Sequence, residues 1–494
     1  SMLHRRIQRS LSRVCINTGF NSNDFRTKKI MEYITKKVPD VEFFGVGGQH
    51  MKTLPNFRNY GDVGLLMDKN FFPRRHQAYG PFGYDFLPLA HTNFFVKKEM
   101  NLLEKQGFWE EFDRDVAIML VNNNEPFAWQ LTKKLAKVCA TFSKPKPLVM
   151  LIEKSKRWYH RHLTFYFDYF LESLPIPQKA NLREAFQYPG TFFGHQGVFD
   201  AYKYILSTDA RYAGCFENGM LRLNKHDLTL IIEELSFNER RKFREKHNIP
   251  DSNYAIYVWA GDAEQEHKKN WPVIIKAVKT FLEDAKQSFQ PSSFTVIVHG
   301  YEVPAELASL GTQTVLVQPS LTDNSERIQA MCASDVGAIC HGHSVSEAAV
   351  AQLPTVVLNC QSFGYAYMTL NYNVWVSEMN MLARGELFPE TTGRNFGEKV
   401  AEFWQQWFAA PKTRYKMARR NTPWLLKMMP PGPTLPHGPM ELESEELLFR
   451  EPDEVLGEFL VEKIKGWEAI RTTGVSGEEL SKTRRSFIYN TPIA

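Results

Sequence analysis

Two glycine-containing turns in this sequence follow apolar runs, at places where a backbone can approach a phosphate. They are VEFFGVGGQHM, residues 41–51, and YVWAGDAEQE, residues 257–266. Bare backbone between a strand and a helix leaves N–H groups available to an anion. The second turn nevertheless carries three carboxylates that repel an anion, at Asp262, Glu264 and Glu266. A lone glycine after a strand, such as Gly261, is more often part of an ordinary tight turn.

A third group of reactive side chains occurs in CHGHSVSE, residues 340–347. Cys340, His341 and His343 are metal-ligand types, but alternate residues on one turn, with no distant partner at ligand spacing, are more typical of satisfied polar groups. The sequence therefore predicts no metal site and no cofactor.

The totals limit the class of protein. The chain has 494 residues, 43% of them hydrophobic and 23% charged, which indicates two or three globular domains. A net charge of +5 does not by itself indicate a nucleic-acid binder. The six cysteines show no CxxC spacing and favour reduced, buried thiols. No apolar run approaches the roughly 20 residues that a membrane span needs, so we expect no transmembrane segment.

Apolar runs alternate with amphipathic stretches twice along the chain, and this rhythm predicts an α/β fold with two doubly wound, Rossmann-like domains. Ligands of such sheets bind outside the carboxyl ends of the strands, so function is expected in a cleft between facing domains. We expect a basic tail over 1–12, the first domain over 13–205 and the second over 206–410. Residues 411–494 read as a Pro/Gly linker, an acidic segment and a C-terminal helix that caps a domain or docks on a partner.

The segment MLHRRIQRSLSRV near the beginning is rich in Arg and Ser and contains no acid. It suits a short mitochondrial presequence, and the alternative is a basic flexible tail. We therefore expect a mitochondrial matrix protein.

Several segments resemble, in order, motifs of the lipid-A-disaccharide synthases, which are GT-B glycosyltransferases with two Rossmann-like domains. The resemblance covers roughly residues 13 to 395 and rests on TGFNSNDF, VEFFGVGGQHM, YGDVGLLMD, GTFFGHQGVFDAY, YVWAGDAEQE, ASDVGAICHGHSVSEAAVAQLPTVVLN and NMLARGELFPE. It implies a second domain on the nucleotide-sugar side. The activity it implies is transfer of an acylated glucosamine from UDP to a second glucosamine lipid.

The groups that this reaction needs are partly missing. Where the family has its catalytic Asp, this chain has Val121 or Asn122, depending on a one-residue shift, and Glu125 is the nearby carboxylate. Where the family has an Arg against the diphosphate, it has Ala263. No residue is therefore predicted to be catalytic.

Other family positions keep their residue types and suggest a vestigial pocket. On the nucleotide-sugar side the kept residues are Gly261, Gly342, Asn380 and Glu347, which could hold a ribose. His341 and His343 belong to the same predicted pocket but replace small hydroxyl residues of the family motif. In the first domain the kept residues are Gly19, Ser22, Asp24, Gly47, Gly48 and His195. His195 is open to two interpretations, a functional His at a strand end or a structural His bonded to neighbouring backbone.

Two functions remain open. The first is a protein that has lost catalysis and serves as a mitochondrial scaffold or assembly component, with a protein or ribonucleoprotein partner such as the mitoribosome. RNA contact is predicted through basic clusters that include Arg74, Arg75, Lys154, Lys156, Arg157 and Arg161, although solvated helix faces would look the same. The second is an active UDP-sugar-dependent glycosyltransferase, and UDP-sugar binding would separate the two.

Overall fold

The computed structural model divides the chain into two compact units. Unit 1 comprises residues 1–194 and 452–494, and unit 2 comprises residues 195–451. The residues that the structure describes are 12–17, 25–46, 56–60, 100–113, 115–122, 134–135, 137–138, 147–153, 168–172, 190–261, 264–288, 293–320, 323–340, 343–358, 396–409, 411–432 and 446–472.

The first sheet, in unit 1, contains seven strands that are all parallel, in the order β3-β2-β1-β4-β5-β6-β7. Its strands are β1 (Arg13–Asn17), β2 (Glu42–Val46), β3 (Phe57–Asn59), β4 (Val116–Asn122), β5 (Leu148–Glu153), β6 (Tyr169–Glu172) and β7 (Gly190–Phe192). Apolar clusters cover both faces of the sheet, which is typical of parallel sheets. One cluster includes residues of α2 (Phe25–Lys37) and α17 (Pro452–Thr472), and the other includes η3 (Phe108–Asp113).

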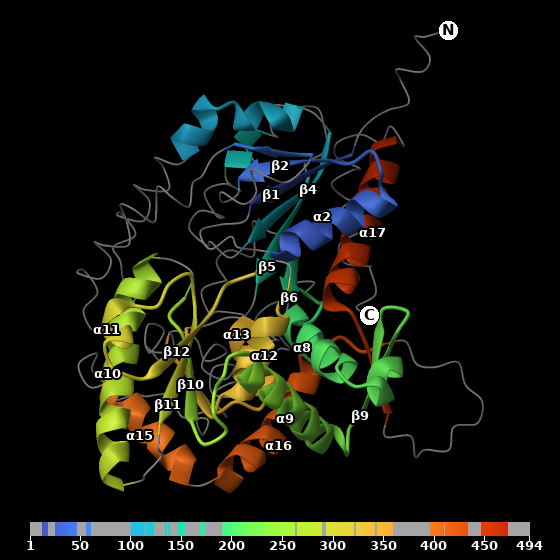
Figure 1. Cartoon of the computed structure of the whole chain (residues 1–494). Helices are drawn as coiled ribbons and strands as arrows, with labels where there is room; N and C mark the ends of the chain where they lie inside the picture. The colour runs from blue at the N-terminus through green and yellow to red at the C-terminus, as the bar shows by residue number, and fades with distance from the viewer. Residues whose placement is uncertain are drawn as a thin grey trace, which may run out of the picture. The chain divides into compact units, whose positions relative to one another are not determined.

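The second sheet, in unit 2, is also wholly parallel and has the order β12-β11-β10-β13-β14. Its strands are β10 (Tyr254–Trp259), β11 (Phe294–His299), β12 (Gln313–Val317), β13 (Val336–Ile339) and β14 (Thr355–Val357). Helices lie on both of its faces, α10 and α15 on one and α12 and α13 on the other (Figure 1). The helices of this unit are α8 (Gln196–Ser207), α9 (Leu228–Lys246), α10 (Glu264–Ser288), α11 (Ala305–Ala308), α12 (Ser325–Ala333), α13 (His343–Val350), α15 (Phe396–Ala409) and α16 (Pro411–Lys427).

Both sheets have the Rossmann strand order, in which the first strand lies between the second and the fourth. The predicted fold class of two doubly wound, Rossmann-like domains is therefore confirmed, while the cleft expected between them stays a prediction. A small antiparallel sheet completes unit 2, with the order β15-β9-β8. It contains β8 (Phe216–Glu217), β9 (Met220–Asn224) and β15 (Glu446–Arg450), and unit 2 also includes η4 (Ala210–Cys215).

The unit boundary falls after Gly194, whereas the sequence analysis places it after residue 205. The difference is α8, which packs against α13 and α9 within unit 2. A second difference concerns residues 411–427, expected to begin a linker, which form α16 instead. Ala418, Leu425 and Leu426 recur at helical spacing and are buried, and this packing outweighs the cost of Pro423.

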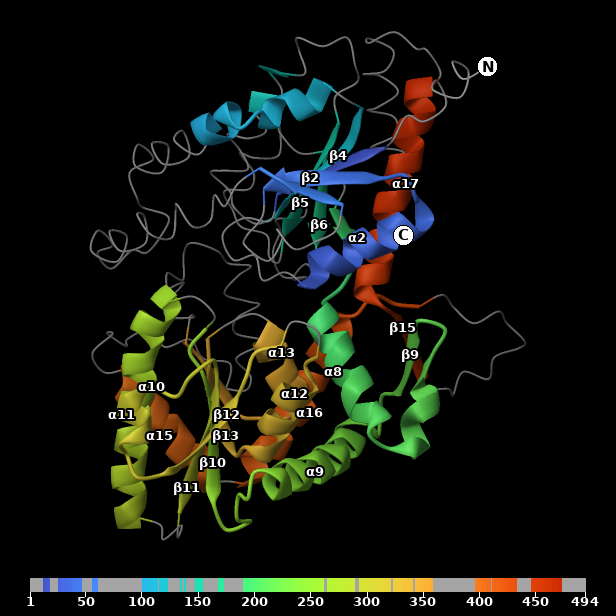
Figure 2. The ribbon, with the colours of Figure 1, turned by 45° about the horizontal axis from the view of Figure 1, so that its top comes forward.

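The C-terminal helix α17 crosses back to unit 1 (Figure 2). Its apolar face, including Leu456, Leu460 and Ile464, packs with Ile30 and Ile34 of α2. Of the two uses expected for this helix, the described residues therefore show capping of a domain. No helix within the described ranges is both long and apolar enough to cross a bilayer.

Candidate functional site

The carboxyl edge of the second sheet is the candidate site. Strand order reverses between β10 and β13, and ligands of doubly wound sheets bind at this switch point. β10, β11 and β13 end there at Trp259, His299 and Ile339, and the helices α10, α12 and α13 each follow a strand of this sheet. Polar side chains from these strand ends and helices therefore converge on one edge.

Glu347 of α13, one of the predicted pocket residues, is paired. Its side chain is 2% exposed, and its two carboxylate oxygens accept hydrogen bonds from Nε (2.7 Å) and Nη2 (2.6 Å) of Arg327 in α12. A bidentate guanidinium–carboxylate pair is among the strongest hydrogen-bonded arrangements in proteins. The carboxylate charge is thus neutralised within the fold.

The turn after β10 is held by side chains of α10. Gly261 has a left-handed φ of 110°, and its carbonyl accepts a hydrogen bond from Nε2 of His267 at 2.7 Å. Asn270 Nδ2 donates to the carbonyl of Ala260 (2.8 Å) and contacts Sγ of Cys340 (3.2 Å). Because Ala260 and Cys340 follow β10 and β13, Asn270 bridges the switch point itself. The carbonyl groups of this turn and the amide of Asn270 therefore already form hydrogen bonds within the protein.

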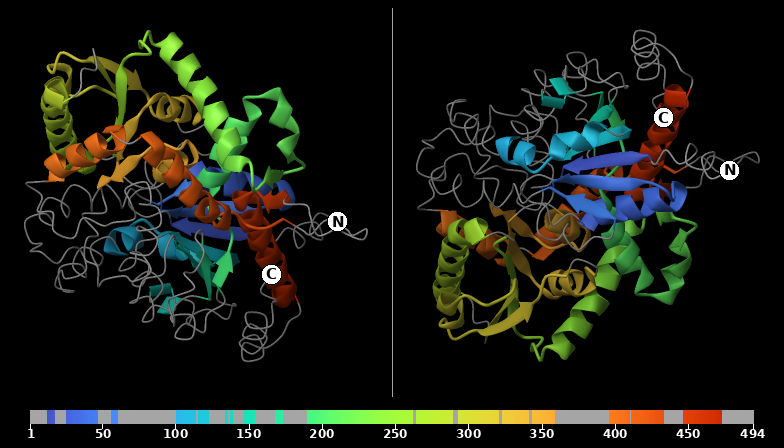
Figure 3. Two further views of the ribbon diagram at one scale, coloured as in Figure 1. Left: turned by 90° about the horizontal axis from the view of Figure 1, so that it is seen from below. Right: turned by 90° about the horizontal axis from the view of Figure 1, so that it is seen from above.

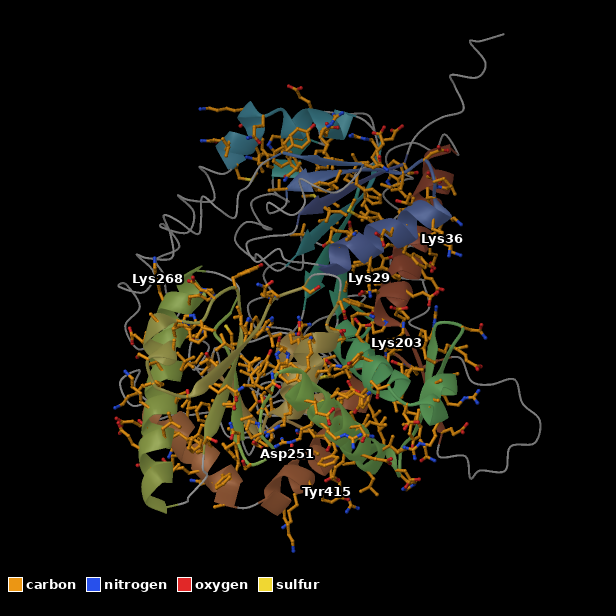
Figure 4. All side chains as sticks on the ribbon, viewed as in Figure 1. Lys29, Lys36, Lys203, Asp251, Lys268 and Tyr415 are labelled. Atoms are coloured by element: carbon orange, nitrogen blue, oxygen red, sulfur yellow. The ribbon has the colours of Figure 1, made fainter. Side chains whose placement is uncertain are left out.

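A cation also lies near the beginning of α10. Lys268 is exposed and extends from this end of the helix (Figure 4). The first turns of α10 therefore carry a cation as well as the carboxylates of Glu264 and Glu266. In the sequence Lys268 stands five residues after position 263, where the family has its Arg.

His299 is a site residue that the sequence analysis missed. It is 3% exposed, its Nδ1 lies 3.1 Å from the hydroxyl of Tyr257, and its ring stacks on Trp259 at 5.7 Å between centroids. Within the described residues, Nε2 has no hydrogen-bond partner. Burial, with a further contribution from the charge of Arg327, lowers the pKa of His299 to about 3, so the ring is neutral at physiological pH. The signal was available, because FTVIVH is an otherwise apolar strand that ends on a histidine.

His195 immediately precedes α8 and has structural contacts. Its side chain is 4% exposed and its Nε2 lies 3.3 Å from Oγ of Ser346 in α13. Its backbone N–H donates to the carbonyl of Met428 at 2.7 Å. These contacts link α8, α13 and the residue that follows α16 within unit 2, and the choice between the two interpretations of His195 stays a prediction.

The carboxyl end of β4 in the first sheet has a different character. Val121 is 1% exposed and belongs to the apolar cluster with Cys15, Phe44 and Val149, while Asn122 ends the strand. Neither of these two positions carries a carboxylate that could act as the base. Gly45 in β2 has φ 152°, and a Cβ there would collide with the Ile16 carbonyl of β1, so this glycine permits close approach of two backbones.

Several predicted positions fall outside the described residues. They are Gly19, Ser22, Asp24, Gly47, Gly48, Ala263, His341, Gly342 and Asn380, together with the basic residues Arg74, Arg75, Lys154, Lys156, Arg157 and Arg161. His343 begins α13, but its side chain is not described. Across the described ranges, no group of three or more His, Cys, Asp and Glu residues could hold a metal ion. Cys15, Cys332 and Cys340 are buried thiols, and Cys215 is a partly buried one.

Part of the second unit matches a known protein family. Residues 228–414 match the family described as lipid-A-disaccharide synthetase (LpxB). This match confirms the resemblance over that segment, which contains the candidate site, and the protein is glycosyltransferase-like. Among curated proteins, none matches the sequence.

Solved structures with a similar fold have low sequence identity. A UDP-GlcNAc 2-epimerase from Neisseria meningitidis bound to UDP-GlcNAc is 13% identical, with a TM-score of 0.38, over 92% of this chain and 100% of that one. The S. aureus MnaA–UDP structure is 12% identical, with a TM-score of 0.44, over 84% and 92%. A glycosyltransferase from Rickettsia africae is 9% identical, with a TM-score of 0.41, over 92% and 98%. Because these scores lie below 0.5, the fold rests on the sheet topology of the chain itself.

Proposed function

We propose that this glycosyltransferase-like protein has lost sugar transfer and serves as a scaffold or assembly component. The observation that carries the proposal is the bidentate pairing of Glu347 with Arg327. A ribose hydroxyl would bring no charge to this carboxylate, whereas the guanidinium of Arg327 pairs with it as an ion through two hydrogen bonds. The nucleotide pocket is therefore committed to internal contacts.

Two further features support the loss of transfer. The end of β4 offers Val121 and Asn122 where the acceptor hydroxyl needs a base, and positioned bases contribute about 10²–10⁴-fold to rates. Ala263 stands where the diphosphate needs a cation, and removal of one such electrostatic group costs about 10²–10³-fold. Together the losses leave little rate enhancement.

We place the scaffold in the mitochondrial matrix, in a ribonucleoprotein such as the mitoribosome or one of its assembly intermediates. Support comes from the basic segment near residue 1 and from clusters in which Arg and Lys alternate with aromatic residues, such as FPRRH and KSKRWYHRH. Such clusters can contact phosphates while their aromatic rings stack on bases. Affinity purification from mitochondria tests this placement, with an RNase-treated sample to separate RNA-mediated from direct protein contacts.

The loss of transfer is tested by isothermal titration with UDP and with UDP-N-acetylglucosamine, together with an assay for UDP release. We expect no saturable binding up to millimolar nucleotide and no release. The matched variants are Glu347→Ala in the pocket and Glu402→Ala, an exposed acid paired with Lys399 on α15. Saturable binding that Glu347→Ala abolishes and Glu402→Ala preserves would overturn the proposal.

A second candidate is an active UDP-sugar-dependent transferase that makes a glycolipid of the lipid A disaccharide type. The match of residues 228–414 to the lipid-A-disaccharide synthetase family favours it. Incubation with labelled UDP-N-acetylglucosamine and a glucosamine-lipid acceptor distinguishes the two candidates. Labelled lipid in the organic phase would establish transfer, and label that stays in the nucleotide agrees with the first candidate.

A further inference from the structure

Helix α9 exposes apolar side chains on one face. Within the described residues, the large hydrophobic side chains that are mostly exposed are Leu230 (52%), Phe237 (66%) and Tyr301 (71%). Leu230 and Phe237 are seven residues apart on α9, and with about 3.6 residues per turn they lie on the same face. The opposite face is buried through residues that include Ile232, Leu235 and Phe243.

This face also lies at the periphery of unit 2. α9 runs along the outside of that unit in Figure 2, and both views of Figure 3 show it (green, residues 228–246) at the edge of the same unit. Two large apolar side chains, two turns apart on this face, are left exposed. The charges of this face decide which partner fits.

The charges on this face are arranged symmetrically about Phe237. Glu233 lies four residues before it and Arg241 four residues after it, and both are exposed. Arg241 is 64% exposed and has only a 3.9 Å contact with Glu245, while Glu233 has no ion pair among the described residues. The adjacent charges are already engaged, because Glu234 binds Arg211 and Arg240 binds Asp335.

We propose that α9 docks antiparallel against α9 of a second copy of this chain, with the two-fold axis beside Phe237. Reversal of the helix about Phe237 brings Glu233 of each copy to the level of Arg241 of the other. The two Phe237 rings then meet at the axis, and each Leu230 lies about one turn beyond the pair of Glu233 and Arg241. A two-fold interface needs a patch that is complementary to itself, and this arrangement of charges provides one.

The expected dimer is weak. One pair of helices buries less than the roughly 1,200–2,000 Å² of a standard interface, so we expect a dissociation constant of about 10–100 µM. The dimer does not depend on the nucleotide site, so its test is independent of the proposed function.

Sedimentation velocity of the full-length protein over a concentration series tests the proposal. We expect concentration-dependent dimerisation of the wild type, and a rise of at least about 30-fold in the dissociation constant for Phe237→Ser, because buried aromatic anchors dominate such contacts. Tyr301→Ser is the matched control, an equally exposed aromatic outside α9, and should dimerise like the wild type. A wild type that stays monomeric at several hundred micromolar would overturn the proposal.

Charge exchange tests the antiparallel register. Glu233→Arg and Arg241→Glu each place like charges opposite one another twice per dimer, so each should weaken self-association about tenfold. The double variant restores both pairs and should recover the wild-type constant. A mixture of the two single variants should form heterodimers as well, because both contacts are then complementary. Failure of the double variant and of the mixture to recover dimerisation would refute this register.

Discussion

The carboxyl edges of the two sheets differ, although both sheets have the same strand order. In the first sheet β4 is apolar up to Val121, which lies in the core, and ends at Asn122. In the second sheet the edge holds His299, Arg327 and Glu347, all buried or nearly so. The comparison shows that packing of apolar strands stabilises the doubly wound fold, and that the side chains at the carboxyl edges can differ between the two sheets.

A second buried carboxylate shows how this molecule uses such groups. Glu111 in unit 1 accepts hydrogen bonds from Arg13, Arg58 and Tyr60. Burial raises the pKa of Glu111, but the two guanidinium groups outweigh this and hold it below its usual value. An Arg-paired buried acid is thus a structural device in unit 1, and Glu347 with Arg327 is the same device in unit 2.

The largest effect should come from placing the missing carboxylate at the edge of the first sheet. Val121→Asp buries an unpaired charge among apolar side chains, so the free energy of unfolding should fall by about 5 kcal/mol. Val121→Thr, which keeps the shape, should cost about 1–2 kcal/mol. Urea denaturation measures both. If the two variants were equally stable, position 121 would face water, and the argument against a base there would fail.

Close backbone approach at the same edge gives the next largest effect. In Gly45→Ala the added methyl group would overlap the Ile16 carbonyl, so β1 and β2 must separate, at a cost of about 4 kcal/mol. Gly311→Ala is the matched control, because Gly311 also has a positive φ, of 72°, but no atom lies within 4 Å of the added carbon. We expect about 1 kcal/mol there. Equal losses in thermal denaturation would show that φ, and not the approach of the strands, requires glycine.

At the edge of the second sheet, Glu347→Ala should lower the free energy of unfolding by about 3 kcal/mol, because it leaves Arg327 without its carboxylate in a largely buried position. The combined variant Arg327→Met/Glu347→Leu removes both charges and should be close to the wild type. Lys399→Ala breaks an exposed ion pair on α15 and should change the free energy of unfolding by less than about 0.5 kcal/mol. A Glu347→Ala protein as stable as the Lys399→Ala protein would show that the pair does not stabilise the fold.

Much of the framework could be predicted from the sequence, because buried parallel strands are nearly continuous apolar runs. YAIYVW and FTVIVH are examples, and each became a fully buried strand. Residues 411–427 were misjudged because Pro423 and the prolines that follow suggested a linker, whereas apolar spacing and tertiary packing make a helix.

The contacts of the candidate site could not be predicted in the same way. Arg327 and Glu347 lie on different helices, and His195 and Ser346 are 151 residues apart. No local spacing signals such pairs, since strand order and helix packing bring them together. Glu347 could be identified only by its resemblance to a family motif, and that resemblance gave no indication of Arg327.

The smallest effect is a pH dependence at the edge of the second sheet. Because the pKa of His299 is about 3 in the folded state and about 6.5 when exposed, the unfolded chain binds the proton first as the pH falls. The contribution of His299 to stability is thus complete above pH 6.5 and is lost progressively toward pH 3, by up to about 1.4 kcal/mol per pH unit.

Urea denaturation between pH 7 and pH 5 measures this slope. His299→Phe keeps a ring beside Trp259 and removes the titrating group. Its free energy of unfolding should therefore change less steeply with pH than that of the wild type, by up to about 1.4 kcal/mol per pH unit. Tyr257→Phe removes the hydroxyl that contacts Nδ1 but keeps the buried imidazole, so it should keep the wild-type slope. Parallel profiles for the wild type and His299→Phe would mean that a proton reaches His299 in the folded state, and that this edge is open to water.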